Sequence, residues 1–113
     1  MLFRSVRIVA VEPKNVSALL GDEPGLHQIQ GIGDGFIPTV LDKRVINHVV
    51  EVTDDDAVAI TRRLAREDGV LVGTSAGANV FAAVREATFL GEGARVATVL
   101  PDRAERYFST ALL

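Results

Sequence analysis

The five residues Gly73-Thr74-Ser75-Ala76-Gly77 place one hydroxyl side chain between two glycines. They follow a short apolar run, 70–72, and precede a helical pattern, so Ser75 is expected on a strand-to-helix turn. Such a serine could be the nucleophile of a serine hydrolase, whose turn has this G-x-S-x-G form. It could instead bind a polar ligand group at a helix N-terminus, or it could only cap that helix.

The hydrolase interpretation lacks a base. In α/β hydrolases the triad follows the chain order Ser, Asp or Glu, His. Asp102 could supply the acid, but both histidines, His27 and His48, precede Ser75. Without a base the serine hydroxyl is a weak nucleophile, so the sequence favours ligand binding over hydrolysis.

A second glycine-rich stretch includes Gly31, Gly33 and Gly35. It matches neither the dinucleotide fingerprint nor the P-loop, because the sixth-position glycine and the Lys-Ser/Thr pair are absent. A plain turn explains it. The functional alternative is a loop whose bare backbone closes against a ligand.

The composition predicts one domain with a modest core, since the chain has 113 residues. A net charge of −3 gives no support to nucleic-acid binding, and the absence of cysteine excludes disulfides and thiolate metal sites. Neither histidine has partners at metal-ligand spacing. No apolar run approaches membrane-spanning length and no signal-peptide pattern is present, so we expect a cytoplasmic protein without a membrane or metal site.

Strands and helices alternate in the predicted order of elements. Thr53 is the expected N-cap of the second helix, with three aspartates in its first turn, and Gly69 its end. Alternation of this kind predicts an α/β fold, a parallel sheet with helices on both faces. The predicted strands are 6–11, 45–52, 70–73 and 96–100, and the predicted helices are 15–20, 54–68 and 75–90.

The predicted sheet would bring two of the polar turns together. Ligands of open parallel sheets bind beyond the carboxyl ends of the strands. Ser75 follows one predicted strand, and Pro101-Asp102 follow another. We therefore expect Ser75 and Pro101 to face one crevice.

Together these motifs resemble the C-terminal part of cysteine synthase (O-acetylserine sulfhydrylase), a pyridoxal-phosphate (PLP) enzyme of the tryptophan synthase β-chain superfamily. The resemblance covers nearly the whole chain after Ser5. Four motifs carry it, in the family order and spacing: Gln30–Pro38 (QGIGDGFIP), Gly69–Asn79 (GVLVGTSAGAN), Leu100-Pro101-Asp102 and Glu105–Thr110 (ERYFST).

The resemblance implies a single partial domain belonging to the large domain of a fold-type II PLP enzyme. In the family, the serine matching Ser75 hydrogen-bonds the pyridine nitrogen of PLP. The glycine loop matching Gly31 and Gly33 lies near the cofactor and takes part in closure, and Pro101 would lie close to the ring. Family enzymes convert O-acetylserine and sulfide to cysteine and acetate. They are usually homodimers, and some bind serine acetyltransferase.

Several departures accompany the resemblance. The family has glycine at Ala104 and often a second serine at Ala76; Ser-Ala-Gly also occurs in cystathionine β-synthases, with a run like Ile37–Asp42. The family's Schiff-base lysine, carboxylate loop and phosphate loop lie upstream of this region, and neither Lys14 nor Lys43 matches that lysine. We therefore expect a C-terminal fragment that is inactive alone, needs the missing N-terminal portion, and is marginally stable or self-associates. The alternatives are a stand-alone α/β interaction module and a fragment like cystathionine β-synthase.

Overall fold

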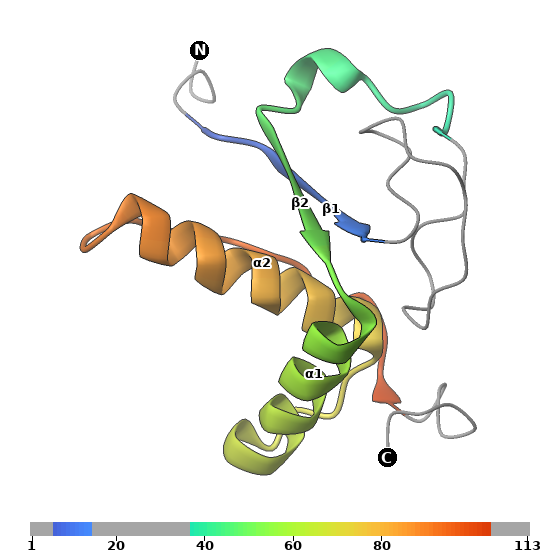
Figure 1. Ribbon diagram of the computed structural model, residues 1–113, viewed down its shortest axis with the longest axis vertical. Helices are drawn as coiled ribbons and strands as arrows, with labels where there is room; N and C mark the ends of the chain where they lie inside the picture. The colour runs from blue at the N-terminus through green and yellow to red at the C-terminus, as the bar shows by residue number, and fades with distance from the viewer. Residues whose placement is uncertain (1–5, 15–36, 105–113) are drawn as a thin grey trace.

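The computed structural model describes residues 6–14 and 37–104. The elements in chain order are β1 (Val9–Pro13), a 3-10 helix η2 (Lys43–Val45), β2 (His48–Val52), α1 (Asp54–Asp68) and α2 (Thr74–Leu90), as Figure 1 shows. The predicted helix 15–20, the Gly31 and Gly33 loop and the final ERYFST motif lie outside the described residues.

β1 and β2 form a two-stranded parallel sheet, with Val11 opposite Val50. The predicted parallel pairing and α/β class are therefore confirmed. β1 begins later than the predicted strand because the Ile8 N–H donates to the Asn47 side-chain oxygen, at 2.7 Å, and not to a strand. After Pro13, which has no N–H, the ladder ends with the Lys14 N–H donating to the Val52 carbonyl, at 2.9 Å.

β2 also begins later than predicted, because Lys43–Val45 turn as a short 3-10 helix. Asp42 caps this turn: its carboxylate accepts the Arg44 backbone N–H, at 3.0 Å, and pairs with the Arg44 guanidinium, at 2.9 Å. The Arg44 side chain is the main reason that the pKa of Asp42 lies below its usual value. A local capping interaction thus overrides the apolar pattern at the start of the predicted strand.

Two predicted strands are absent from the described structure. In the 70–73 run, Val72 makes only an isolated antiparallel bridge with Arg103. The 96–100 run is exposed throughout and pairs with no described strand. A strand exists only where a neighbour satisfies its backbone groups, and the described part of the chain supplies no neighbour for 96–100.

α1 has the predicted bounds and caps. The Thr53 hydroxyl accepts the Asp56 backbone N–H, at 3.1 Å, and donates to the Asp56 carboxylate, at 2.8 Å. Both interactions satisfy groups at the helix start, where carboxylates also suit the helix dipole. Gly69 ends the helix in the left-handed conformation, with φ 67°.

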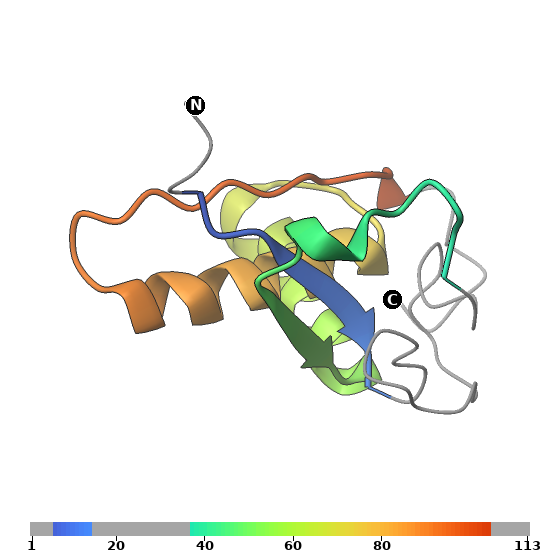
Figure 2. The ribbon, with the colours of Figure 1, turned by 90° about the horizontal axis from the view of Figure 1, so that it is seen from above.

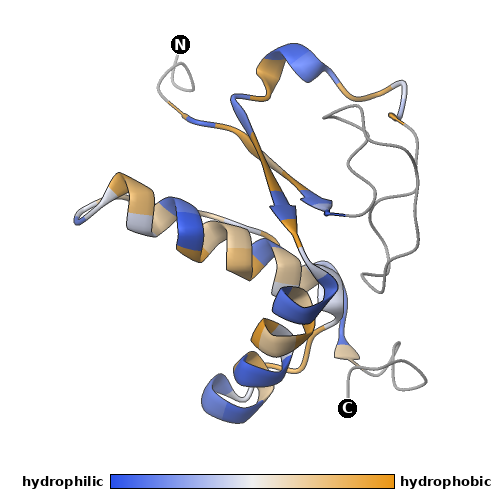
Figure 3. Cartoon of the chain, viewed as in Figure 1, coloured by the Kyte–Doolittle hydropathy of each residue, from blue (hydrophilic) through white to orange (hydrophobic). Residues whose placement is uncertain are grey.

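α2 lies between α1 and the sheet and contacts α1, β1 and β2 (Figures 1 and 2). In Figure 3 α1 has broad hydrophilic turns, whereas much of α2 is pale to orange, as suits a helix with neighbours on two sides. The small core lies at this junction and comprises Val50, Val52, Ala57, Ala78 and Ala82, with Val9, Val11 and Phe81 packed against it.

Candidate functional site

Ser75 is the second residue of α2, and its side chain is buried, with 2% of the residue exposed. The helix begins at Thr74, one residue before the predicted start; its N-cap is Gly73, and no side chain caps this end. The alternative in which Ser75 only caps the helix is therefore wrong. Its hydroxyl lies inside the first turn of the helix, not at the cap position.

The first turn of α2 presents backbone donors beside that hydroxyl. Helix geometry leaves the first N–H groups without intrahelical partners. Here the Gly77 N–H is the first to bond within the helix, donating to the Gly73 carbonyl at 3.3 Å. The N–H groups of residues 74–76 and the positive end of the helix dipole accordingly favour an acceptor or an anion at this end.

The segment that contains Pro101 runs alongside this end of α2. The Gly73 N–H donates to the Asp102 carbonyl, at 3.0 Å, and the Ala104 N–H donates to the Leu71 carbonyl, at 3.2 Å. On the other side of Pro101, the Asn79 side-chain amide donates to the Val99 carbonyl, at 2.8 Å. The two turns that contain Ser75 and Pro101 are therefore adjacent, as predicted.

Gly77 serves the packing of the two helices. A Cβ at this position would collide with the Thr61 hydroxyl oxygen and the Ala57 carbonyl oxygen on α1. The Thr61 hydroxyl donates to that same carbonyl, at 2.7 Å. The second glycine of the motif thus lets α1 approach the helix that contains Ser75.

Sequence reasoning gave no role to Thr61 or Asn79, although Thr61 packs against the Ser75 helix and Asn79 bonds the segment that contains Pro101. Thr61 is buried, with 2% exposed, and lies against Gly77. The sequence feature that could have identified Thr61 is its place one turn after Ala57, on the face of the helix that is otherwise apolar. Asn79 follows Ser75 by four residues and so shares its face of α2.

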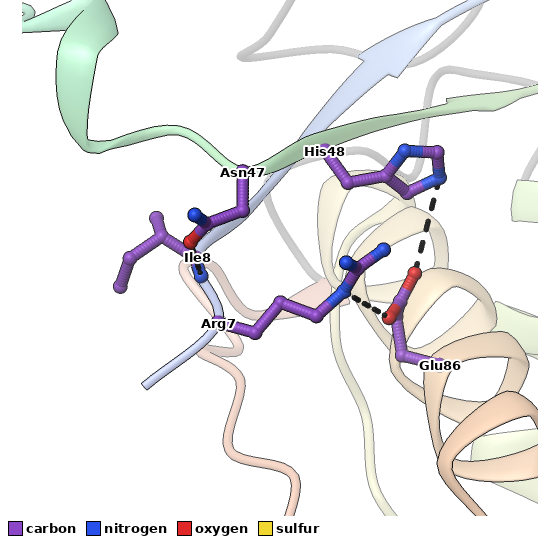
Figure 4. A network of polar contacts seen from close by, with 5 residues as sticks. All are labelled: Arg7, Ile8, Asn47, His48 and Glu86. Carbon is purple, nitrogen blue, oxygen red and sulfur yellow. Dashed lines mark hydrogen bonds and ion pairs between the residues drawn. The ribbon is translucent and has the colours of Figure 1, made fainter. Parts of the chain in front are cut away.

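A separate polar network lies toward the other end of α2 (Figure 4). The Glu86 carboxylate accepts from the Arg7 guanidinium, at 3.1 Å, and lies 4.0 Å from the His48 imidazole. The Arg7 guanidinium also lies over the Phe89 ring, 5.7 Å from its centre. These four residues line a cavity of about 710 Å³. Glu86 is eleven residues from Ser75, about 16 Å along a helix at 1.5 Å per residue, so the network is not part of the Ser75 site.

Neither the described histidine and carboxylate side chains nor the described helices suggest metal or membrane binding. Residues 6–14 and 37–104 contain no group of three such side chains that could bind a metal ion. No helix in the same ranges is long and apolar enough to cross a membrane.

Known proteins are similar over nearly the whole chain. The family model described as "Pyridoxal-phosphate dependent enzyme" matches residues 1–102. Cysteine synthase from Staphylococcus aureus (strain Mu50) is 44% identical over 110 residues, which are 97% of this chain and 36% of that protein. This chain thus spans about a third of the length of the curated relatives that it matches.

Solved structures agree with this match. Cysteine synthase from Entamoeba histolytica superposes with a TM-score of 0.93 at 36% identity, covering 96% of this chain and 32% of that one. The O-acetylserine-dependent cystathionine β-synthase from Helicobacter pylori has a TM-score of 0.89 at 42% identity, covering 96% and 35%. Since the family model matches most of the sequence, the chain belongs to the family of pyridoxal-phosphate-dependent enzymes.

Proposed function

We propose that this chain is the C-terminal part of a cytoplasmic cysteine synthase-like enzyme, a single partial domain that supplies one wall of the cofactor site. The reaction would form cysteine from O-acetylserine and sulfide. The observation that carries the proposal is the buried Ser75 hydroxyl in the first turn of α2, beside Pro101, in a chain 44% identical to cysteine synthase.

The Ser75 side chain fits the pyridine nitrogen of PLP. It is a neutral hydroxyl on a buried turn. A hydroxyl can donate to a ring nitrogen, but unlike a carboxylate it does not stabilise a proton there. When bound, PLP supplies the electron sink for β-replacement. Ser75 would orient the PLP ring. Because the hydroxyl does not hold a proton on the ring nitrogen, the ring would withdraw electrons less strongly than it would beside a carboxylate.

Pro101, Gly31 and Gly33 would complete this wall. Pro101 has no N–H, so it offers the cofactor ring an apolar surface without a competing donor. The flanking bonds of Val99 and Asp102 fix its backbone beside α2. The proposed closure over substrate by Gly31 and Gly33 rests on their resemblance to the family loop.

The chain alone would be inactive, because it offers no amine beside Ser75. Its two lysines are Lys14 and Lys43. Lys14 follows β1, at the cavity that Glu86 lines, and Lys43 is exposed in η2. The aldehyde-binding lysine and the phosphate and carboxylate loops would therefore come from a polypeptide matching the rest of cysteine synthase. As in the family, the assembly would be a homodimer, and its partner would be serine acetyltransferase.

A fusion protein tests this function. The portion of S. aureus cysteine synthase that the match leaves uncovered is joined to this full chain, and cysteine formation is measured with PLP, O-acetylserine and sulfide. We expect activity from the fusion and none from either part alone. A folded fusion without activity would contradict the function, and it would favour the alternative of an interaction module. Activity of the chain alone would contradict its dependence on the other part.

A second candidate is cystathionine synthesis. The H. pylori enzyme is 42% identical to this chain over 96% of its length, and the Ser75-Ala76-Gly77 sequence suits it equally. The same fusion can be supplied with homocysteine in place of sulfide. A higher kcat/KM with homocysteine would assign this second reaction, and a higher value with sulfide would assign cysteine synthesis.

A further inference from the structure

Gly73 is hydrogen-bonded on both sides at the start of α2. Its carbonyl accepts the Gly77 N–H, at 3.3 Å, and this bond closes the turn that has Ser75 at its centre. Its N–H donates to the Asp102 carbonyl, at 3.0 Å, next to Pro101. Gly73 is also buried. The positions of Ser75 and Pro101 therefore both depend on where this one residue lies.

The Thr61 hydroxyl reaches Gly73 from α1. It donates to the Ala57 carbonyl, at 2.7 Å, and to the Gly73 carbonyl, at 3.5 Å. One hydroxyl proton can be shared between two carbonyls in a three-centre bond. Thr61 is 2% exposed, and hydrogen bonds shielded from water are electrostatically stronger than exposed ones. This hydroxyl thus joins α1 to the residue from which the first turn of α2 begins.

Thr88 shows the bond that a threonine ordinarily makes in the middle of a helix. Its hydroxyl donates to the Val84 carbonyl, four residues earlier, at 2.9 Å, and the residue is exposed. A bond of this kind is local and does not stabilise the helix. Thr61 makes the same local bond but also has an acceptor twelve residues away, at the start of a second helix. The contact with Gly73 is therefore what the buried hydroxyl adds to the site.

The glycine at position 77 leaves room for this hydroxyl. A Cβ at Gly77 would collide with the Thr61 hydroxyl oxygen. The hydroxyl consequently lies near both partners of the bond between Gly73 and Gly77. Its removal would leave that turn without its contact to a polar group of α1.

We propose that Thr61 is a positioning residue of the cofactor site: its hydroxyl fixes Gly73 relative to α1, and through Gly73 it sets where Ser75 and Pro101 lie. This proposal rests on the proposed function and adds a residue that acts through Gly73, not by contact with the cofactor. The position matters because a displacement of about 1 Å in a site can lower the rate by about a hundredfold.

Thr61→Ala and Thr61→Ser separate the hydroxyl from the bulk of the side chain. Both variants lose the methyl group and neither adds an atom, so they differ from each other only in the hydroxyl. Thr88→Ala is the control for a lost local bond, because the Thr88 hydroxyl bonds within its own helix.

The first measurement is amide exchange at Gly73 and Gly77 in the fusion protein without PLP. We expect exchange about three- to tenfold faster in Thr61→Ala than in Thr61→Ser, as the loss of one hydrogen bond predicts. Thr61→Ser and Thr88→Ala should both lie close to wild type. Equal exchange in the two Thr61 variants would overturn the proposal.

The second measurement is the affinity of the same fusions for PLP, with the visible absorbance of the bound cofactor. We expect Thr61→Ala to weaken PLP binding by about three- to tenfold and to shift the absorbance, and Thr61→Ser to restore both. Binding by the wild type with equal affinities in the two variants would overturn the positioning role and leave the proposed function intact. A folded wild-type fusion that binds no PLP would contradict both.

Discussion

The Thr61 hydroxyl on α1 occupies the space into which a side chain at Gly77 on α2 would project. Thr61 donates to the Ala57 carbonyl, so the oxygen that meets Gly77 is fixed by its own hydrogen bond. The two helices can therefore approach closely only because residue 77 has no side chain. This close approach also sets the position of the Ser75 turn.

Gly77→Ala should lower the free energy of unfolding by about 1–3 kcal/mol, the usual cost of overpacking. The sign of this change distinguishes a close contact from open space, because Gly→Ala in an unobstructed helix raises the free energy of unfolding by about 1 kcal/mol. Urea unfolding of the isolated chain measures it. In Thr61→Ala/Gly77→Ala only part of the loss should return, since the Ala57 carbonyl remains in contact. A higher free energy of unfolding in Gly77→Ala would disprove the close contact between α1 and α2 at this position.

Asn79→Ala should release the Pro101 segment from α2. The lost bond to the Val99 carbonyl, 2.8 Å long, is worth about 0.5–1.5 kcal/mol. Faster amide exchange at Gly73, whose N–H bonds the Asp102 carbonyl, is the specific readout. Thr88→Ala is the control, because the Thr88 hydroxyl bonds only within its own helix, to the Val84 carbonyl. Equal exchange at Gly73 in both variants would exclude an anchoring role for Asn79.

Glu86→Gln should destabilise the chain by about 1–3 kcal/mol, because it removes the charge of a buried acceptor. The side chain of Glu86 is 10% exposed and that of its partner Arg7 is 38% exposed, so we expect the lower half of this range. Glu67→Gln is the matched control: its carboxylate also pairs with an arginine, but the side chains are 58% and 65% exposed.

Thermal melts of the two variants measure the difference. Glu67→Gln should change the stability by less than about 0.5 kcal/mol, as exposed pairs generally do. The Arg7–Glu86 pair joins the segment before β1 to α2. An equal loss of stability in the two variants would mean that burial does not strengthen the Arg7–Glu86 pair.

The parts of the fold that could be predicted from the sequence are those with local causes. Thr53 caps α1 through Asp56, three residues away, and Gly69 ends the same helix by its own backbone freedom. The 96–100 run has strand-forming residues, but pairing depends on a distant neighbour, so the predicted strand was wrong. The predicted strand 45–52 begins only at His48, because the local bond between Asp42 and Arg44 holds Lys43–Val45 in a 3-10 helix.

In the candidate site, too, the features with local causes could be predicted and those that depend on distant residues could not. The turn sequence predicted that Ser75 lies at the start of a helix. The expected proximity of Ser75 and Pro101 rested on two strands that the described structure lacks, but the Gly73–Asp102 bond brings their turns together. The role of Gly77 depends on Thr61, sixteen residues earlier, and no local pattern encodes that contact. Gly31 and Gly33 lie outside the described residues, so their role stays a prediction.

The most direct test of the central claim is the kcat of the fusion protein after Ser75→Ala, compared with Thr88→Ala on the same helix. If Ser75 bonds the cofactor ring, its removal should lower kcat by about tenfold or more, shift the visible absorbance of bound PLP, and leave the melting temperature near that of the control. Unchanged kcat and absorbance in Ser75→Ala would contradict the claim that this chain supplies a wall of the cofactor site.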